Sequence, residues 1–345
     1  MRREIQIGNI KIGGSNRIAI QSMLSAPSEN TAACLAQAKA LEAAGCDILR
    51  IAVPNETSVK TLSALKENVQ MPIVADIHFD YKLALAAAEA GADKIRINPG
   101  NIGSQEKVRQ VVNACKAQNI PIRIGVNSGS LEKEILEKYG APTAPALVES
   151  ALGHVALLER FDFEDIVISI KSSNVKTMID AFRLISQKCD YPLHIGVTEA
   201  GPGRRGVIKN AVGIGALLAD GIGDTIRVSL TDDPLREIEA ANDILSALDL
   251  LPDAPQLISC PTCGRTQIDL IQLANDVEQM LKSVHKPIKV AVMGCAVNGP
   301  GEAREADIGI AGGKNEGLIF KKGKILYKVP YDQLAQVLRS EIEKL

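Results

Sequence analysis

Short apolar runs rich in Ile, Val and Leu alternate with Ala- and Leu-rich segments of helical periodicity through the first 250 residues. Runs of this length, bounded by Gly, Pro and Asp, are typical of buried strands, and the longer segments between them are typical of helices. Strands separated by helices predict parallel β/α units. We expect strands near residues 17–23, 47–53, 71–78, 93–98, 120–127, 165–171, 192–198 and 224–230.

The number and spacing of these units predict a closed barrel. Eight β/α units in about 250 residues match the size of a (β/α)8 TIM barrel. A weak repeat of the form Asp-x-Ile/Leu-Arg-Ile/Val supports this interpretation, because it recurs at 47–51, 93–97 and 224–228 after glycine-containing helix ends. A doubly wound open sheet is the alternative that the pattern leaves open.

The chain changes character after a proline-bounded linker, Leu251-Pro-Asp-Ala-Pro255. The remainder predicts a small α/β domain, so we expect a barrel domain over 1–250 and a second domain over 256–345. Within the second domain we expect a helix near 266–284, a strand near 287–293, a β-hairpin near 307–328 and a closing helix over 331–344.

Composition narrows the possible functions. The 345 residues carry 39 basic and 41 acidic side chains, and aromatic residues make up 3% with no Trp. This balance argues against a nucleic-acid binder that depends on a basic surface or on base stacking. No apolar run reaches the roughly 18 residues of a membrane-spanning helix, and no signal peptide is apparent. With an odd count of 7 Cys, we expect a reduced, cytoplasmic protein.

Polar residues share one parity at the C-terminal ends of five predicted strands, whereas the opposite parity is mostly apolar. Side chains alternate across a strand, and the C-terminal ends of barrel strands form the active face. The pairs are Asp76 and His78, Arg96 and Asn98, Arg123 and Asn127, Ser169 and Lys171, and Arg227 and Ser229. These residues are therefore expected at the mouth of the barrel.

Five strands each bring one cation to that mouth, and together they outnumber the inward acids, Asp76 and Glu199. Such an excess predicts a polyanionic ligand, most simply a phosphate ester, because guanidinium forks match phosphate oxygens. The five cations are Arg50, Arg96, Arg123, Lys171 and Arg227.

The loop Gly201-Pro-Gly-Arg204-Arg205-Gly206 follows the seventh predicted strand and leads into a helix. Glycine backbone can approach an anion closely, and phosphate sites of this fold often use this loop. An ordinary loop with solvated arginines is the alternative. Thr198 and Glu199 precede the loop, and Glu199 is a candidate proton donor in a mouth lined with cations.

Three of the seven cysteines have the spacing of a metal or redox site. Cys260 and Cys263 form a C-x-x-C motif, and Cys295 follows an apolar strand in a glycine-rich segment. Three interpretations remain open: a zinc site with His285 as its fourth ligand, a redox dithiol, and an iron–sulfur cluster with one open iron.

The sequence resembles one known family over nearly its whole length, the bacterial 4-hydroxy-3-methylbut-2-enyl diphosphate synthases. The motifs Cys260-Pro-Thr-Cys263-Gly-Arg and Gly294-Cys295-Ala-Val-Asn298-Gly-Pro-Gly-Glu302-Ala resemble the cluster motifs of that family. The strand-end motifs agree: Gln21-Ser-Met, Ala75-Asp-Ile-His78, Arg96-Ile-Asn-Pro-Gly100, Arg123-Ile-Gly-Val-Asn127, Lys171-Ser-Ser, Gly196-Val-Thr-Glu199-Ala-Gly and Arg227-Val-Ser229.

The resemblance implies an N-terminal TIM barrel followed by a small α/β iron–sulfur domain. It implies a [4Fe–4S] cluster held by Cys260, Cys263, Cys295 and the carboxylate of Glu302. The implied reaction is the reductive ring opening and dehydration of 2-C-methyl-D-erythritol 2,4-cyclodiphosphate to (E)-4-hydroxy-3-methylbut-2-enyl diphosphate. Flavodoxin or ferredoxin would supply the electrons. Family members are homodimers in which the cluster domain of one subunit caps the barrel of the other.

The residues take roles within that reaction as hypotheses. We expect the five cations to hold the diphosphate, with Arg204 and Arg205 nearby and Asn98, Asn127, Thr198 and Ser229 as hydrogen-bond donors. The candidate catalytic residues are His78, Glu199, Asn298 and Glu302, with Glu199 as proton donor to the departing hydroxyl. One alternative is a redox-inert barrel enzyme, such as a dihydropteroate synthase-like transferase, with a structural zinc tail. Another is a non-catalytic phospholigand-binding protein.

Overall fold

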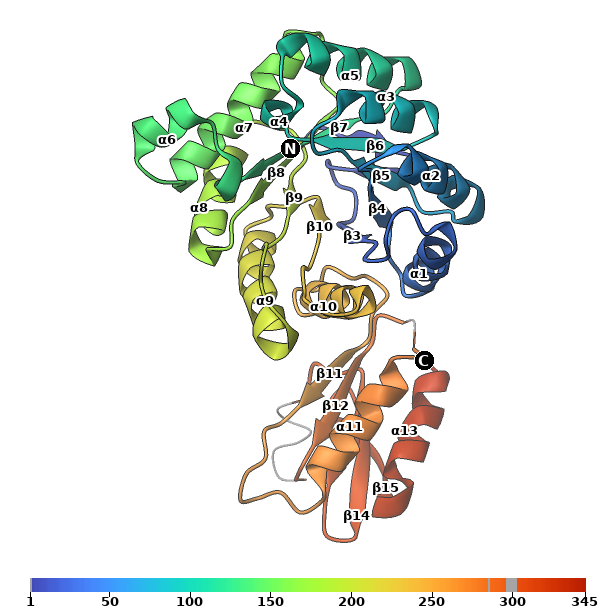
Figure 1. The fold of residues 1–345 in the computed structure, drawn as a ribbon. Coiled ribbons are helices and arrows are strands. Elements are labelled where there is room, and N and C mark those ends of the chain that lie inside the picture. The colour runs from blue at the N-terminus through green and yellow to red at the C-terminus, as the bar shows by residue number, and fades with distance from the viewer. Residues whose placement is uncertain (1, 285, 296–302) are drawn as a thin grey trace. The chain divides into compact units, whose positions relative to one another are not determined.

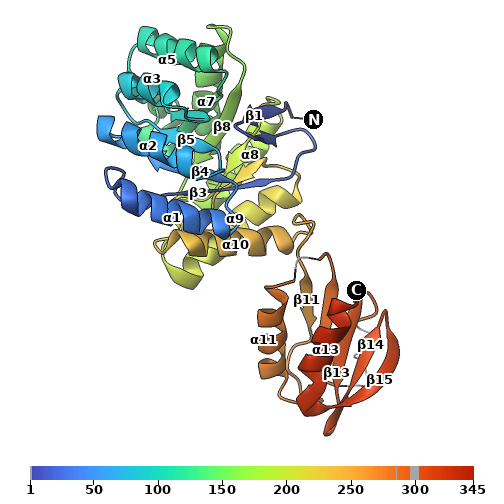
Figure 2. The ribbon, with the colours of Figure 1, turned by 90° about the vertical axis from the view of Figure 1, so that its right-hand side faces the viewer.

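A computed structural model describes residues 2–284, 286–295 and 303–345 of the chain. The chain divides into two compact units, Met1–Leu250 and Leu251–Leu345. Figures 1 and 2 show the elements of both units from two directions. Each unit is described below by itself.

The first unit is a parallel eight-stranded barrel whose strands are ringed by helices (Figure 1). Its strands follow the order β8-β7-β6-β5-β4-β3-β10-β9, and a parallel bridge between Ile168 and Leu193 joins the two ends. The strands are β3 (Ala19–Met23), β4 (Ile48–Ala52), β5 (Ile73–Asp76), β6 (Lys94–Ile97), β7 (Ile122–Asn127), β8 (Ile166–Lys171), β9 (His194–Ile195) and β10 (Thr225–Ile226). The predicted TIM barrel is confirmed, and the open-sheet alternative is wrong.

Several barrel helices begin at a short polar side chain that caps their first turn. Asn30, Asn55 and Asn174 each accept a hydrogen bond from a backbone N–H in the first turn of the helix that follows. The helices are α1 (Thr31–Ala43), α2 (Glu56–Asn68), α3 (Tyr81–Glu89), α4 (Pro99–Ile102), α5 (Gln105–Gln118), α6 (Lys133–Tyr139), α7 (Ala144–Glu159), α8 (Val175–Ser186), α9 (Gly203–Ala219) and α10 (Pro234–Ser246).

An N-terminal hairpin closes the floor of the barrel, a feature that the sequence patterns did not predict. Its strands are β1 (Ile5–Ile7) and β2 (Ile10–Ile12). Their isoleucines form one buried cluster with residues near the N-terminal ends of the barrel strands, including Ala19, Ile48 and Val74. The apolar floor excludes water from that end, so the polar interior described below opens toward the C-terminal ends of the strands.

The second unit is a five-stranded mixed sheet in the order β11-β12-β13-β14-β15. Its elements are β11 (Gln256–Ser259), α11 (Leu270–Leu281), β12 (Lys289–Met293), β13 (Ile308–Gly312), β14 (Glu316–Lys321), β15 (Lys324–Pro330) and α13 (Leu334–Glu343). The segment predicted as one hairpin holds three strands, β11 was not predicted, and α11 begins later than expected at Leu270.

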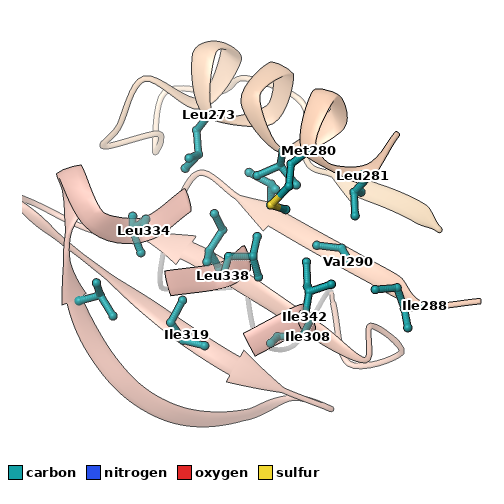
Figure 3. Packing of buried hydrophobic residues seen from close by; sticks show 14 of the residues in the cluster. Leu273, Met280, Leu281, Ile288, Val290, Ile308, Ile319, Leu334, Leu338 and Ile342 are labelled. Carbon is teal, nitrogen blue, oxygen red and sulfur yellow. The ribbon is translucent and has the colours of Figure 1, made fainter. Parts of the chain in front are cut away.

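Helices α11 and α13 pack on one face of this sheet. Figure 3 shows Leu273 and Met280 of α11, together with Leu338 and Ile342 of α13, against Val290 and Ile319 of the strands. The opposite face carries a second buried cluster that includes Met293 and Phe320. The described helices of the chain include none that is long and apolar enough to cross a membrane.

Candidate active site

The five predicted cations come together inside the barrel. Four of them lie on strands β4, β6, β7 and β8, and Arg227 directly follows β10. Arg96 of β6 is directly in register with Arg123 of β7. Arg50, Arg96 and Arg123 are buried, with Arg123 completely inaccessible to solvent. Burial lowers the pKa of the Lys171 ammonium well below its ordinary value, and the charges of the four arginines lower it further. This mutual effect shows that the cations occupy one shared space.

Asp76 of β5 is the acid at the centre of this group. Its side chain is fully buried, with Oδ2 2.5 Å from Nη2 of Arg50 and Oδ1 3.1 Å from Nη1 of Arg96. Burial alone raises the pKa of Asp76, but Arg50 and Arg96 outweigh it and hold the pKa well below its ordinary range. The half-exposed His78 places Nε2 3.6 Å from the same carboxylate. Asp76 therefore neutralises part of the charge of two arginines.

A second buried acid, Glu237 of α10, forms an ion pair with Arg227. Glu237 was not predicted from the sequence. Its carboxylate accepts hydrogen bonds from Arg227 Nη2 at 3.3 Å, from the Leu230 backbone N–H at 3.0 Å and from Ser22 Oγ at 3.2 Å. Burial raises the pKa of Glu237, and Arg227 opposes that rise. The expected inward acid Glu199 is instead exposed. Glu237 lies on a helix, so strand parity gives no signal for it.

Many nitrogen atoms in this interior have no hydrogen-bond partner among the described residues. They include Nε and Nη1 of Arg50, Nε of Arg96, Nε and Nη2 of Arg123, and Nε of Arg227. A buried donor without an acceptor destabilises a protein by about 1–3 kcal/mol, and more when it is charged. Several such donors on one interior surface indicate a ligand that supplies many acceptor oxygens.

Two glycines, Gly125 within β7 and Gly196 directly after β9, allow close approaches at this site. A Cβ atom on Gly125 of β7 would lie 2.5 Å from Nε of Arg96, so the Arg96 guanidinium lies over this glycine. A Cβ atom on Gly196 would lie 2.5 Å from the carbonyl oxygen of Arg227. Glycine in a strand interior often marks such a close approach. Both residues lie within the strand-end motifs that the sequence analysis quoted.

A pocket opens beside the cations at strands β8, β9 and β10. Its lining includes several residues expected to bind substrate. The lining residues are Ser169, Lys171, His194, Gly196, Val197, Thr198, Arg227 and Ser229. The structure thus brings Lys171, Thr198, Arg227 and Ser229 to one concave surface.

The two asparagines expected to bind substrate differ in their partners. Asn98 caps α4 by accepting the Gly100 N–H at 3.1 Å, and its Nδ2 donates to Ser130 Oγ at 3.3 Å. Oδ1 of Asn127, by contrast, is buried without a partner in the described chain. Asn98 therefore already has a structural role at the mouth, and Asn127 retains a free acceptor there.

Glu199 and the two loop arginines lie at the rim. Glu199 is exposed and has a φ of 53°, in the left-handed region. A non-glycine residue in this conformation stores roughly 1–2 kcal/mol of strain, and strained residues cluster at functional sites. Arg204 and Arg205 are exposed in the first turn of α9. The rim thus presents one carboxylate and two cations to solvent.

The three cysteines singled out from the sequence follow two adjacent parallel strands of the second unit. Cys260 comes directly after β11, and Cys295 comes two residues after β12. The N–H of Gly294 donates to Cys260 Sγ at 3.2 Å. Within the described chain no three Cys, His, Asp or Glu side chains form a group that could hold a metal ion. Asn298, Glu302 and His285 lie outside the described residues.

The donor set nevertheless fits an iron–sulfur cluster. All three thiols are free, and none forms a disulfide. The backbone N–H and the side chain of Arg265 lower the pKa of the exposed Cys263 thiol, which favours the thiolate that binds metal. A backbone N–H directed at a cysteine sulfur, as at Cys260, is also a common support for cluster ligands.

Comparison with known proteins identifies the family. Residues 2–242 match the family described as "GcpE TIM-barrel domain", and residues 256–344 match "GcpE protein C-terminal domain". The chain belongs to the GcpE family. A relative from Clostridium perfringens is 60% identical over 343 residues, covering 99% of this chain and 98% of its own. A relative from Caldanaerobacter subterraneus subsp. tengcongensis is 58% identical, covering 100% and 97%.

Both relatives carry the name 4-hydroxy-3-methylbut-2-en-1-yl diphosphate synthase (flavodoxin). The family resemblance stated from the motifs is confirmed, and the redox-inert zinc alternative is not favoured. The barrel is also similar to solved structures with low sequence identity. A Yersinia pestis dihydropteroate synthase is 13% identical with a TM-score of 0.53, covering 72% of this chain and 100% of its own. This likeness shows the barrel fold alone.

Proposed function

We propose that the chain converts 2-C-methyl-D-erythritol 2,4-cyclodiphosphate to (E)-4-hydroxy-3-methylbut-2-enyl diphosphate in non-mevalonate isoprenoid biosynthesis. The reaction consumes two electrons and two protons, opens the ring at a C–O bond and releases one oxygen as water. Family membership over both domains supports this assignment. The relatives bear the name of the same product and of flavodoxin.

The observation that carries the proposal is the set of buried cationic donors without acceptors inside the barrel. A cyclic diphosphate supplies several anionic oxygens at one place and can accept from all of these donors. We assign the diphosphate to Arg50, Arg96, Arg123, Lys171 and Arg227. Asp76 and Glu237 hold three of the arginines in position before the ligand arrives, which reduces the entropy lost on binding.

The remaining barrel residues contribute orientation and a proton. Thr198 and Ser229 line the pocket beside Lys171 and donate hydrogen bonds to the substrate. Asn98 and Asn127 complete the set at β6 and β7, and Arg204, Arg205 and His78 lie at the rim. Glu199, at the rim, protonates the departing hydroxyl.

The second domain would carry the redox centre. Cys260, Cys263 and Cys295 would bind three irons of a [4Fe–4S] cluster, Glu302 would bind the fourth, and Asn298 lies in the same motif. When bound, the cluster supplies electrons and a Lewis-acidic iron to the substrate. Flavodoxin is the proposed electron donor, with ferredoxin as the alternative.

The assembly follows from the need to join two separate parts. The substrate site lies in the domain over residues 1–250, whereas the cysteines lie in the domain over 256–345. We propose a cytoplasmic homodimer in which the cluster domain of one subunit caps the barrel of the other. Closure of such a cap would exclude water from the reaction.

Metal analysis after anaerobic purification tests the proposed cofactor. We expect about four irons per chain and broad absorption near ~400 nm. Replacement of a ligand, Cys263→Ser, is expected to reduce the iron content, whereas the matched control Cys189→Ser in the barrel retains it. One zinc per chain, with no cluster after reconstitution, would contradict the proposal and favour a structural zinc tail.

A further inference from the structure

Lys94 is a buried cationic residue to which the proposed reaction assigns no role. It is the first residue of β6, and its side chain has no exposure to solvent. Its Nζ has no hydrogen-bond partner within the part of the chain that the structure describes. Lys94 is in register with Val74 of β5, which belongs to the apolar floor cluster and is itself in register with Arg50 of β4.

Lys94 lies one layer deeper in the barrel than Arg96. Inward-facing side chains on a strand are two residues apart, or about 7 Å, and Arg96 pairs in register with Arg123. Burial lowers the pKa of Lys94 well below its ordinary value, and the charges of Arg123 and Arg50 lower it further. The interior acids do not offset these effects, because Asp76 is paired with Arg50 and Arg96 and Glu237 is paired with Arg227.

Other titratable and polar side chains share the barrel interior with this amine. His194 of β9 donates to or accepts from Thr225 Oγ1 at 2.7 Å, and its pKa is lowered by burial and by nearby cations that include Lys94. Gln21 of β3 is uncharged, and its Oε1 accepts a hydrogen bond from Arg123 Nη1 at 3.3 Å. The titratable and charged side chains of the interior are Arg50, Asp76, Lys94, Arg96, Arg123, Lys171, His194, Arg227 and Glu237.

We propose that Lys94 is a ligand-dependent sixth cation of the diphosphate site, a neutral amine in the free barrel that takes up a proton when the anion binds. The inference rests on the proposed function for the identity of that anion. The proton comes from solvent and converts the amine to an ammonium, with no other bond made or broken. Burial is the larger obstacle to charging the amine, and the positive charges of Arg123 and Arg50 add to it. The anion cancels the field of those two arginines and brings a negative charge beside the amine, which favours the ammonium. Lys94 thus acts as a positioning residue beneath Arg123.

Proton uptake on binding tests this proposal with the iron-loaded enzyme and no reductant, so that no turnover occurs. Calorimetric titration with the cyclic diphosphate in PIPES and HEPES at pH 7.5 gives the number of protons from the dependence of enthalpy on the buffer. We expect wild type to take up about one proton as Lys94 becomes charged. Lys94→Met is expected to take up fewer protons on binding, because the contribution of Lys94 is lost. Its Kd for the cyclic diphosphate should also depend less on pH. In wild type the Kd rises by up to about tenfold per pH unit for each proton taken up.

The controls separate this proposal from the proposed function. Lys39→Met removes an exposed lysine on α1 and is expected to leave the uptake unchanged. Failure of wild type to bind the cyclic diphosphate would contradict the proposed function itself. Binding without proton uptake, or equal uptake by wild type and Lys94→Met, would overturn only the role of Lys94. A lower melting temperature for both Lys94→Met and Lys94→Gln would show a paired, charged lysine in the free barrel and would also overturn it.

Discussion

Asp76→Asn tests the electrostatic organisation of the barrel interior, because it removes the charge that two buried arginines share. The carboxylate lies 2.5 Å from Arg50 and 3.1 Å from Arg96, and the three side chains are between 0% and 4% exposed. Removing one partner of a buried ion pair destabilises a protein by about 3–5 kcal/mol. The amide of Asn still offers one acceptor oxygen, so we expect a loss of about 3 kcal/mol in the free energy of unfolding.

The pH dependence of this loss has a definite sign. The pKa of Asp76 in the folded barrel lies below its ordinary value of 3.8. Its stabilising contribution is therefore complete above the ordinary value and disappears as the pH falls through the folded value. The difference between wild type and Asp76→Asn should be constant from pH 5 to 8 and should narrow below about pH 4.

Urea unfolding followed by far-UV circular dichroism measures the effect at low salt without ligand. Asp180→Asn is the matched control, because its i,i+4 pair with Lys176 is exposed and contributes no more than about 0.5 kcal/mol. A loss below about 1 kcal/mol for Asp76→Asn, or a difference that grows toward acid pH, would refute the assignment of Asp76 as the buried counter-ion.

Substitutions at three further positions test separate parts of the site. Gly125→Ala places a Cβ atom against the Arg96 guanidinium. Calorimetry should therefore show the affinity for the cyclic diphosphate falling by about tenfold, or about 1.4 kcal/mol. Unchanged affinity would contradict this position of Arg96. Glu199→Gln should reduce kcat with little change in KM, and Glu199→Gly should reduce kcat equally while raising stability by about 1 kcal/mol as the left-handed strain is relieved. Near-normal turnover of either variant would exclude Glu199 as proton donor. Lys94→Met should raise the melting temperature at neutral pH, because a base whose pKa is lowered in the folded protein destabilises the folded state below its unfolded pKa. This gain in melting temperature should shrink as the pH approaches the ordinary lysine pKa of 10.5. A gain that does not depend on pH would contradict a neutral Lys94.

Strand parity predicted the mouth of the barrel because alternation along a buried strand is a local property of the chain. It placed Arg96 and Arg123 on the inner face, and the structure pairs these residues in register. Strand parity could not predict Glu237, because that carboxylate contacts Arg227 from helix α10, and alternation along a strand gives no information about residues on a helix. Glu199 was expected to face inward, but its left-handed backbone turns the chain at the rim.

The second unit was harder to predict because its strands contain glycine and lysine. A single β-hairpin was expected near residues 307–328. The segment from Ile308 to Pro330 folds instead as three strands, with turns at Gly313–Asn315 and Lys322–Gly323. The strands β1 and β2 of the N-terminal hairpin are also too short for alternation of apolar and polar residues to be recognised in the sequence. Lys94 was overlooked because it lies at the start of its strand, away from the mouth.

Product formation by the iron-loaded enzyme tests the proposed ring opening. The enzyme is incubated under anaerobic conditions with 2-C-methyl-D-erythritol 2,4-cyclodiphosphate and reduced flavodoxin, and the phosphorus is followed by ³¹P NMR. We expect the signals of the cyclic diphosphate to be replaced by those of a linear diphosphate, and we expect Arg123→Met to abolish the conversion. Tight binding of the cyclic diphosphate by an iron-replete enzyme, with no linear product under dithionite or flavodoxin, would contradict the proposed ring opening.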